Sequence, residues 1–280
     1  MLYYTLRPFV RLILRLLIKH IAIDGLENIP KSGAVILASN HPNSFFDAIL
    51  ICCRLDRRVW SLARGDVFKK SWTKKLLSSL FMMPVHRLSE GKEHLGDNDD
   101  TFQKCINLFQ QGEIVLIFAE GICTNQKKLL PLKKGTARLA QKVWYDGMDL
   151  VVIPVGVSYD TYNTFGKKIN LNIGKPIQKT DFQEITEYGF FLKTFNDLLT
   201  EKLKELLNWH FSNESFIKNP VYFIGSVINF PANSLAAAIS KKMTKGSVFF
   251  DSITLALMIV VLPIYWILLA YFACYLRNFL

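Results

Sequence analysis

A histidine and an aspartate, six residues apart, are the pair in this sequence best suited to proton transfer. They stand in residues 40–47 (NHPNSFFD), directly after an apolar run. A histidine at a strand end can act as a general base, and a carboxylate can hold its imidazole in the correct tautomer. On a regular helix this spacing would put His41 and Asp47 on different faces. We therefore expect His41 in a turn and Asp47 in the first turn of a helix, with Asn43 or Ser44 as N-cap.

Two further segments place functional residues at the ends of apolar runs. Arg87 follows the run 81–85, and arginine is suited to bidentate binding of phosphate. Glu120 and Gly121 follow the run 113–119, and glycine permits close approach of a ligand to the backbone. Taken alone, Arg87 could equally form a surface salt bridge, so its assignment to phosphate depends on the other motifs.

Lys133 and Pro154 complete the candidate site residues. Lys133 and Lys134 precede a helix expected to begin at Gly135-Thr136, which favours an anion there. Pro154 lies inside the apolar run 150–157, where a missing N–H is costly unless the strand is at an edge or has a bulge. We expect Pro154 to mark a wall of the pocket. The five cysteines have no metal-ligand spacing with histidine, so no metal site is expected.

The elements that position these residues alternate between strands and helices. Continuous apolar runs typical of strands buried on both faces occur at 33–39, 81–85, 113–119, 150–157 and 168–173. Helical patterns lie between and after them, at 44–54, 70–80, 101–111, 136–146 and 188–208. This alternation predicts an α/β fold with a mixed, largely parallel sheet flanked by helices.

The charge balance indicates phosphate-bearing partners. Lys and Arg outnumber Asp and Glu by 34 to 23, a net charge of +11, and such a chain attracts anions. A mean hydropathy of +0.20 fits a membrane-associated protein better than a nucleic-acid-binding one. We therefore expect a lipid membrane as partner and no nucleic acid.

The first 22 residues predict an amphipathic helix at the membrane interface. Arg7, Arg11, Arg15 and Lys19 recur every four residues among apolar side chains and form one stripe. Arginines in mid-segment argue against a spanning helix and against a secretory signal. The alternative is a helix packed on its own domain with the basic stripe in water.

The last 65 residues, 216–280, predict a membrane-associated region, leaving 23–215 for the catalytic domain. Residues 252–276 carry no charge and could span a bilayer. Lys241, Lys242 and Lys245 precede them, which would keep that side cytoplasmic. Pro263 also permits a kinked or re-entrant segment, and a buried hairpin of the domain is the other alternative.

The motifs at residues 40–47, 83–87, 118–124 and 152–157 resemble, in their order, those of the phospholipid/glycerol acyltransferase family, to which bacterial 1-acylglycerol-3-phosphate acyltransferases belong. The resemblance covers about residues 23–180 and implies that family's glycerolipid acyltransferase fold. It implies that His41 deprotonates an acceptor hydroxyl, which then attacks the thioester of acyl-CoA or acyl-carrier protein, with Asp47 supporting His41.

The resemblance also implies a substrate-binding set and a location. Substrate is expected at Asn40, Arg87, Glu120, Gly121, Lys133 and Pro154. Lysophosphatidic acid is the expected acceptor, in phospholipid synthesis at a membrane, with the active site on the cytoplasmic face. No cofactor is expected, because the acyl thioester is a co-substrate.

Two departures from the family pattern leave the acceptor open. Five residues separate His41 from Asp47 where four are usual, and the third motif reads FAEGICT, with Cys123 in place of an expected arginine. Glycerol 3-phosphate or another lysophospholipid is therefore an alternative acceptor. A catalytically silent lipid-binding protein is the alternative from another class.

Overall fold

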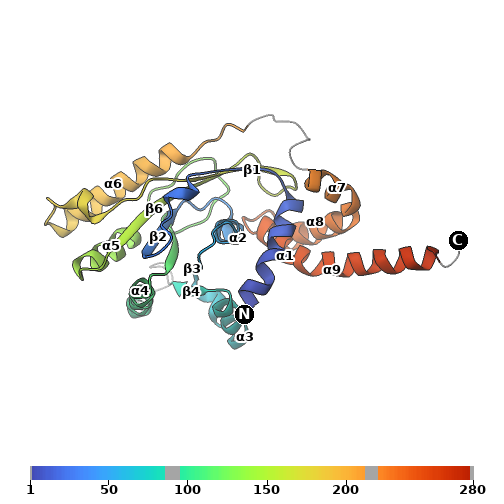
Figure 1. Cartoon of the computed structure of the whole chain (residues 1–280), viewed down its shortest axis with the longest axis horizontal. Helices are drawn as coiled ribbons and strands as arrows, with labels where there is room; N and C mark the ends of the chain where they lie inside the picture. The colour runs from blue at the N-terminus through green and yellow to red at the C-terminus, as the bar shows by residue number, and fades with distance from the viewer. Residues whose placement is uncertain (1, 86–94, 212–219, 278–280) are drawn as a thin grey trace.

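One seven-stranded sheet forms the centre of the molecule, in the order β1-β7-β6-β2-β5-β3-β4 (Figure 1). The computed structural model describes residues 2–85, 95–211 and 220–277. The neighbouring strands are parallel except for β6 and β7. The strands are β1 (Ile18–Asp24), β2 (Ala34–Ser39), β3 (Val59–Arg64), β4 (Met82–Val85), β5 (Ile114–Phe118), β6 (Leu150–Tyr159) and β7 (Lys167–Ile173). The sheet is thus mixed and largely parallel.

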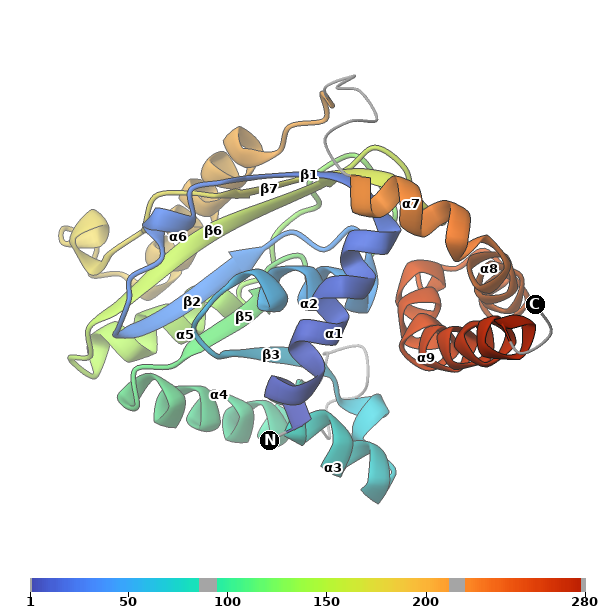
Figure 2. The ribbon, with the colours of Figure 1, turned by 45° about the vertical axis from the view of Figure 1, so that its right-hand side comes forward.

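Helices cover both faces of this sheet (Figure 2). One face packs against α4 (Leu95–Gln110), α5 (Gly135–Tyr145) and α6 (Tyr188–Leu206). The other packs against α1 (Leu2–Leu17), α2 (Ser44–Arg54), α8 (Phe230–Thr244) and α9 (Phe250–Arg277). The other α-helices of the described residues are α3 (Ser71–Ser79) and α7 (Pro220–Ile228). Every residue of β2 is buried because it lies between these two layers.

All five predicted strands and all five predicted helices are confirmed, most within two residues of their ends. The main boundary difference is α4, which begins at Leu95 rather than at 101. β1 and β3 are additions. Most of their residues are not fully buried, because β1 is an edge strand of the sheet and β3 lies next to the opposite edge strand. Such strands lack the continuous apolar run that marks a doubly covered strand.

The amino-terminal helix packs on its own domain. Ile13 and Leu14 of α1 are fully buried in the same core as β2 and α2. The first strand begins at Ile18, so the sheet starts within the segment 1–22, before the expected boundary at residue 23. The apolar face of α1 is therefore covered by protein, and a position of this helix at a membrane interface stays a prediction.

The carboxyl-terminal helix has two different halves. Leu255, Met258 and Leu262 lie in the core with β2 and α2. From Pro263 onward the large apolar side chains are mostly exposed, among them Ile267 and Phe272, and this half extends away from the domain (Figure 1). By length and composition, α9 could cross a membrane. Its first half, however, is part of the domain core.

Candidate active site

Three adjacent parallel strands, β5, β2 and β6, bring the candidate residues to their carboxyl ends, which we call the carboxyl edge of the sheet. Ser39, the last residue of β2, pairs with Val155 of β6 and with Phe118 of β5. His41 follows β2, Glu120 follows β5, and β6 ends at Tyr159. In open α/β sheets, ligands bind outside the carboxyl ends of such strands.

His41 and Asp47 form a hydrogen-bonded pair, as the sequence predicts. Nδ1 of His41 lies 3.0 Å from Oδ2 of Asp47, and the two side chains are 15% and 0% exposed. An ionised Asp47 accepts the proton of Nδ1, which leaves Nε2 as the nitrogen that can take a proton from another molecule. The pair therefore has the geometry of a general base and its orienting carboxylate.

Asp47 has two further donors that fix it in place. The backbone N–H of Asn43 donates to Oδ2 at 2.7 Å, and the hydroxyl of Tyr159 donates to Oδ1 at 2.6 Å. Burial and then the carboxylate of Asp47 raise the pKa of Tyr159 well above its usual value. Tyr159 therefore remains a protonated donor over the working pH range.

The imidazole plane is fixed by an aromatic neighbour. The ring of Phe118 stacks on that of His41 with centroids 3.7 Å apart and planes 13° apart. Phe118 is the last residue of β5, so the same strand end that carries the third motif also orients the base. The imidazole ring is thus held by the hydrogen bond of Nδ1 to Asp47 and by stacking of one face on Phe118.

The turn between His41 and Asp47 has an unusual backbone. Asn43 is the N-cap of α2, and Asp47 lies in its first turn, as predicted. Ser44 has φ 49°, in the left-handed region that non-glycine residues rarely adopt. Its N–H donates to Sγ of Cys123 at 2.8 Å. The turn thus accommodates its extra residue with strain and with support from the third motif.

Glu120 holds the turn to the loop that follows β5. Its Oε2 accepts the N–H of His41 at 2.8 Å, and its Oε1 accepts the N–H of Leu130 at 2.7 Å. Burial raises the pKa of Glu120, and these two hydrogen bonds act in the opposite direction. The structure therefore gives Glu120 a role in building the site, while substrate contact stays a prediction.

Gly121 and Lys133 lie against one another. Gly121 has φ 66°, and a Cβ there would lie 2.9 Å from Cγ of Lys133. The N–H of Lys133 donates to the carbonyl of Ala119 at 2.8 Å, and its side chain is exposed. A glycine is required here by both backbone conformation and space, and the Lys133 ammonium is accessible to an anion.

Asn40, which directly follows β2, and Pro154, which lies in β6, are both buried. The amide of Asn40 donates to and accepts from the backbone of Val157, at 2.9 and 2.8 Å. This bond ties the start of the turn to β6, so Asn40 has a structural contact and substrate binding by it stays a prediction.

The expectation that Pro154 lies at an edge or a bulge is not supported, while its place in the wall of a substrate pocket stays a prediction. It is buried in β6, an internal strand, opposite Ala38. Its missing N–H is tolerated because the β6–β7 ladder ends at Ile173, and Pro154 only accepts, from the N–H of Gly174 at 2.9 Å. Arg87 lies outside the described residues.

Sequence reasoning missed several residues that support the pair. Tyr159 is the last residue of β6, two residues beyond the predicted run 150–157, and its place beside Asp47 follows only from the order of the strands. Asn43 donates through Nδ2 to Asp251 at 2.8 Å, and Phe46 donates through its N–H to Ser252 at 3.1 Å. No local signal could indicate contacts across more than 200 residues of chain.

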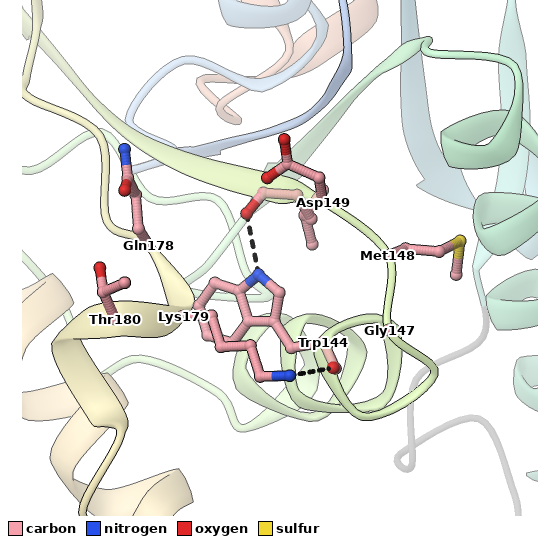
Figure 3. Close-up of a pocket in the computed structure, with 8 residues that line it drawn as sticks. Trp144, Gly147, Met148, Asp149, Gln178, Lys179 and Thr180 are labelled. Carbon is pink, nitrogen blue, oxygen red and sulfur yellow. Dashed lines mark hydrogen bonds between the residues drawn. The ribbon is translucent and has the colours of Figure 1, made fainter.

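A separate pocket of about 240 Å³ lies at the amino edge of the sheet, the end at which β6 begins, beside Leu150 (Figure 3). There the indole N–H of Trp144 donates to the carbonyl of Leu150, and the ammonium of Lys179 donates to the carbonyl of Trp144, both at 2.8 Å. These donors are already satisfied by backbone, and the pocket adds no group to the His41 site.

A buried carboxylate–histidine pair at the carboxyl edge of a largely parallel sheet is a site built for proton abstraction. Comparison with known proteins gives the class. The Acyltransferase family model matches residues 20–158, a stretch that contains this pair. The chain belongs to the phospholipid/glycerol acyltransferase family.

Individual relatives share part of their length with this chain. Tafazzin of Drosophila melanogaster is 28% identical over 63% of this chain and 49% of its own length. The chloroplastic 1-acyl-sn-glycerol-3-phosphate acyltransferase BAT2 of Brassica napus is 26% identical, over 48% of this chain and 37% of its own. The chain thus matches about half, or less, of these relatives' lengths.

A solved structure shares the fold. The crystal structure of the 1-acyl-sn-glycerophosphate (LPA) acyltransferase PlsC of Thermotoga maritima superposes with a TM-score of 0.52 at 20% identity, covering 73% of this chain and 79% of PlsC. At that identity the likeness supports the sheet and its flanking helices. It does not identify the substrate of this chain.

Proposed function

We propose that this chain is a membrane-bound O-acyltransferase that moves a fatty acyl group from acyl-CoA or acyl-carrier protein to a hydroxyl of lysophosphatidic acid. The observation that carries the proposal is the 3.0 Å contact between Nδ1 of His41 and the fully buried Asp47. Family membership and relatives named as acyltransferases support the same reaction class.

In the proposed reaction, Nε2 of His41 accepts the proton of the acceptor hydroxyl as the oxygen attacks the thioester carbonyl. A new C–O ester bond forms, the C–S bond breaks, and the imidazolium returns the proton to the leaving thiolate. Asp47 stabilises the imidazolium that forms between these steps. The reaction needs no metal or prosthetic group, because the thioester supplies the activation.

Lysophosphatidic acid is proposed as acceptor because exposed basic residues adjoin the site. Lys133 lies against Gly121, three residues beyond Phe118, whose ring stacks on His41. Its ammonium could bind a phosphate as a point charge. Glycerol 3-phosphate is the second candidate, since Cys123 replaces the arginine expected in the third motif and its Sγ instead accepts the N–H of Ser44.

The proposal places the protein on a membrane, with the site on its cytoplasmic face. Support comes from the apolar side chains exposed on α7, α8 and the second half of α9, such as Phe223, Phe230 and Ile267. Three lysines, Lys241, Lys242 and Lys245, precede α9, and a basic flank favours the cytoplasmic side.

Membrane binding should be tested on the exposed half of α9 alone. Removal of the whole helix would also remove core residues such as Leu255. Replacing Ile267 and Phe272 by serine should release the protein from vesicles that retain the wild type in high salt, without loss of its melting transition. Release of the wild type by salt alone would contradict insertion.

The function itself is tested by offering purified protein one labelled acyl-CoA with lysophosphatidic acid and glycerol 3-phosphate as competing acceptors. Product from lysophosphatidic acid supports the proposal, and product from glycerol 3-phosphate alone replaces the acceptor. If neither gives product, acyl-carrier-protein donors and other lysophospholipids follow. Failure of all of these would favour a catalytically silent lipid-binding protein.

A further inference from the structure

The first residues of α9 contact the turn that carries the His41–Asp47 pair. Oδ2 of Asp251 accepts the side-chain N–H of Asn43 at 2.8 Å, and Oγ of Ser252 accepts the backbone N–H of Phe46 at 3.1 Å. Asp251 and Ser252 are both buried. The first residues of α9 therefore contact the turn of the candidate active site, while its second half exposes apolar side chains.

A buried lysine from β7 completes this contact. Nζ of Lys167 lies 2.5 Å from Oδ2 of Asp251, and the two side chains are 3% and 4% exposed. The same ammonium lies 5.5 Å from the centre of the Phe46 ring. Burial lowers the pKa of Lys167, and the carboxylate of Asp251 acts against that shift. A buried ion pair is a poor source of net stability, and its best-attested use is to specify one arrangement.

The turn is one that needs such support. Asn43, the N-cap residue, forms no side-chain cap with its own helix. Its Nδ2 donates to Asp251 instead, and its buried Oδ1 has no partner among the described residues. The N–H groups of Ser44 and Phe46 are satisfied by Cys123 and Ser252, from two other segments. Ser44 is in the left-handed region, and such strain persists only where the surroundings fix it.

We propose that Asp251 and Ser252, with Lys167 holding Asp251, are positioning residues that set the His41–Asp47 geometry through Asn43 and Phe46. Neither residue is expected to touch substrate. The inference rests on the proposed function for its kinetic consequence, whereas its structural consequence can be measured independently.

Ser252→Ala is the first test, and Thr254→Val is its matched control. Thr254 is also a buried hydroxyl on α9, but it donates to Ser240 of α8 at 2.9 Å and not to the turn. A misplacement of about 1 Å can cost a hundredfold in rate, so we expect kcat to fall by about tenfold or more for Ser252→Ala. KM for both substrates and the melting temperature should match those of the control, whose kcat should equal that of the wild type.

The second test separates position from charge. Asp251→Asn should lower kcat and stability together, because it leaves the ammonium of Lys167 buried without its partner. Adding Lys167→Met removes that charge, while the amide oxygen introduced at 251 can still accept the N–H of Asn43. The double variant should therefore recover both stability and most of kcat. Recovery of stability without recovery of kcat would contradict the role given to the Asn43 contact.

A spectroscopic readout distinguishes failure of this inference from failure of the proposed function. The Nδ1 proton that His41 shares with Asp47 should give a low-field proton resonance in histidine-labelled wild type and in Thr254→Val. This resonance should be absent from Ser252→Ala. If wild-type protein transfers no acyl group, this resonance alone decides the inference. The proposal is overturned if Ser252→Ala keeps the resonance, or if its kcat equals that of Thr254→Val in an active enzyme.

Discussion

At the carboxyl edge of the sheet, buried polar side chains from distant parts of the chain bond to one turn, whereas in the pocket beside the start of β6 the hydrogen bonds join residues at most 35 positions apart. Tyr159 reaches Asp47 across 112 residues of sequence, and Asp251 reaches Asn43 across 208. In the pocket at the other edge, Trp144 donates to a carbonyl six residues away and Lys179 donates to one 35 residues away. Converging long-range contacts, rather than a concave surface, mark the place in this molecule that is organised for chemistry.

The largest expected effect is that of Asp47→Asn, a change that keeps the shape and removes the charge at the carboxyl edge. An amide cannot hold His41 in the correct tautomer or stabilise an imidazolium, so kcat should fall by about 10³- to 10⁴-fold. Asp149→Asn at the opposite edge, where the side chain is exposed, is the matched control and should leave kcat unchanged. Equal effects of the two changes on acyl transfer would erase the distinction between the edges.

Tyr159→Phe should have an intermediate effect. Loss of a hydrogen bond to a buried charge costs about 1.5–3 kcal/mol, and the free energy of unfolding should fall by about that amount. If about 1.4 kcal/mol of this support acts in the transition state, kcat falls about tenfold. The exposed Tyr145 supplies the control, Tyr145→Phe, in both the denaturation and the rate measurement. An unchanged kcat would remove Tyr159 from the catalytic network.

Trp144→Phe tests the amino edge. It removes the hydrogen bond to Leu150 and part of a buried ring, at a cost of about 1–3 kcal/mol in unfolding free energy. Since no group of this pocket adjoins His41 in the described structure, kcat per folded molecule should stay at the wild-type value. A drop in kcat below the melting range would show that the two edges are coupled.

The smallest expected effect is the pH dependence contributed by Glu120. Because burial raises its pKa, the folded protein holds a proton that the unfolded chain releases. This contribution to stability is fully present below the ordinary pKa of 4.5 and is lost as pH rises through the raised value. The unfolding free energy of wild type minus that of Glu120→Gln should therefore decrease as pH rises above 4.5. A difference that increases over this range would contradict the sign.

Much of the fold could be predicted because the central strands are apolar on both faces. All of β2 and the first three residues of β5 are buried, and such apolar runs stand out in a sequence. β1 could not be predicted because Lys19 continues the basic stripe of the preceding helix. As an edge strand paired only with β7, β1 also lacks a continuous apolar run. Local pattern cannot report which strands are neighbours.

The site could be predicted in part for the same reason. His41 and Asp47 share one short segment, so their spacing alone indicates a turn followed by a helix. The support from Tyr159, Asp251 and Lys167 depends on strand order and on where α9 begins. The sequence of α9 predicts a membrane segment and gives no sign that its first half lies in the core, because a run of apolar residues fits lipid and a protein core equally well.

The most direct test of the central claim, that His41 is the general base, is the acyl-transfer rate of His41→Ala beside that of His210→Ala, an exposed histidine. Removing a general base should lower kcat by about 10²- to 10⁴-fold, and free imidazole should restore part of the rate. His210→Ala should match the wild type. Retention of wild-type kcat by His41→Ala, in a protein that remains folded, would contradict the account.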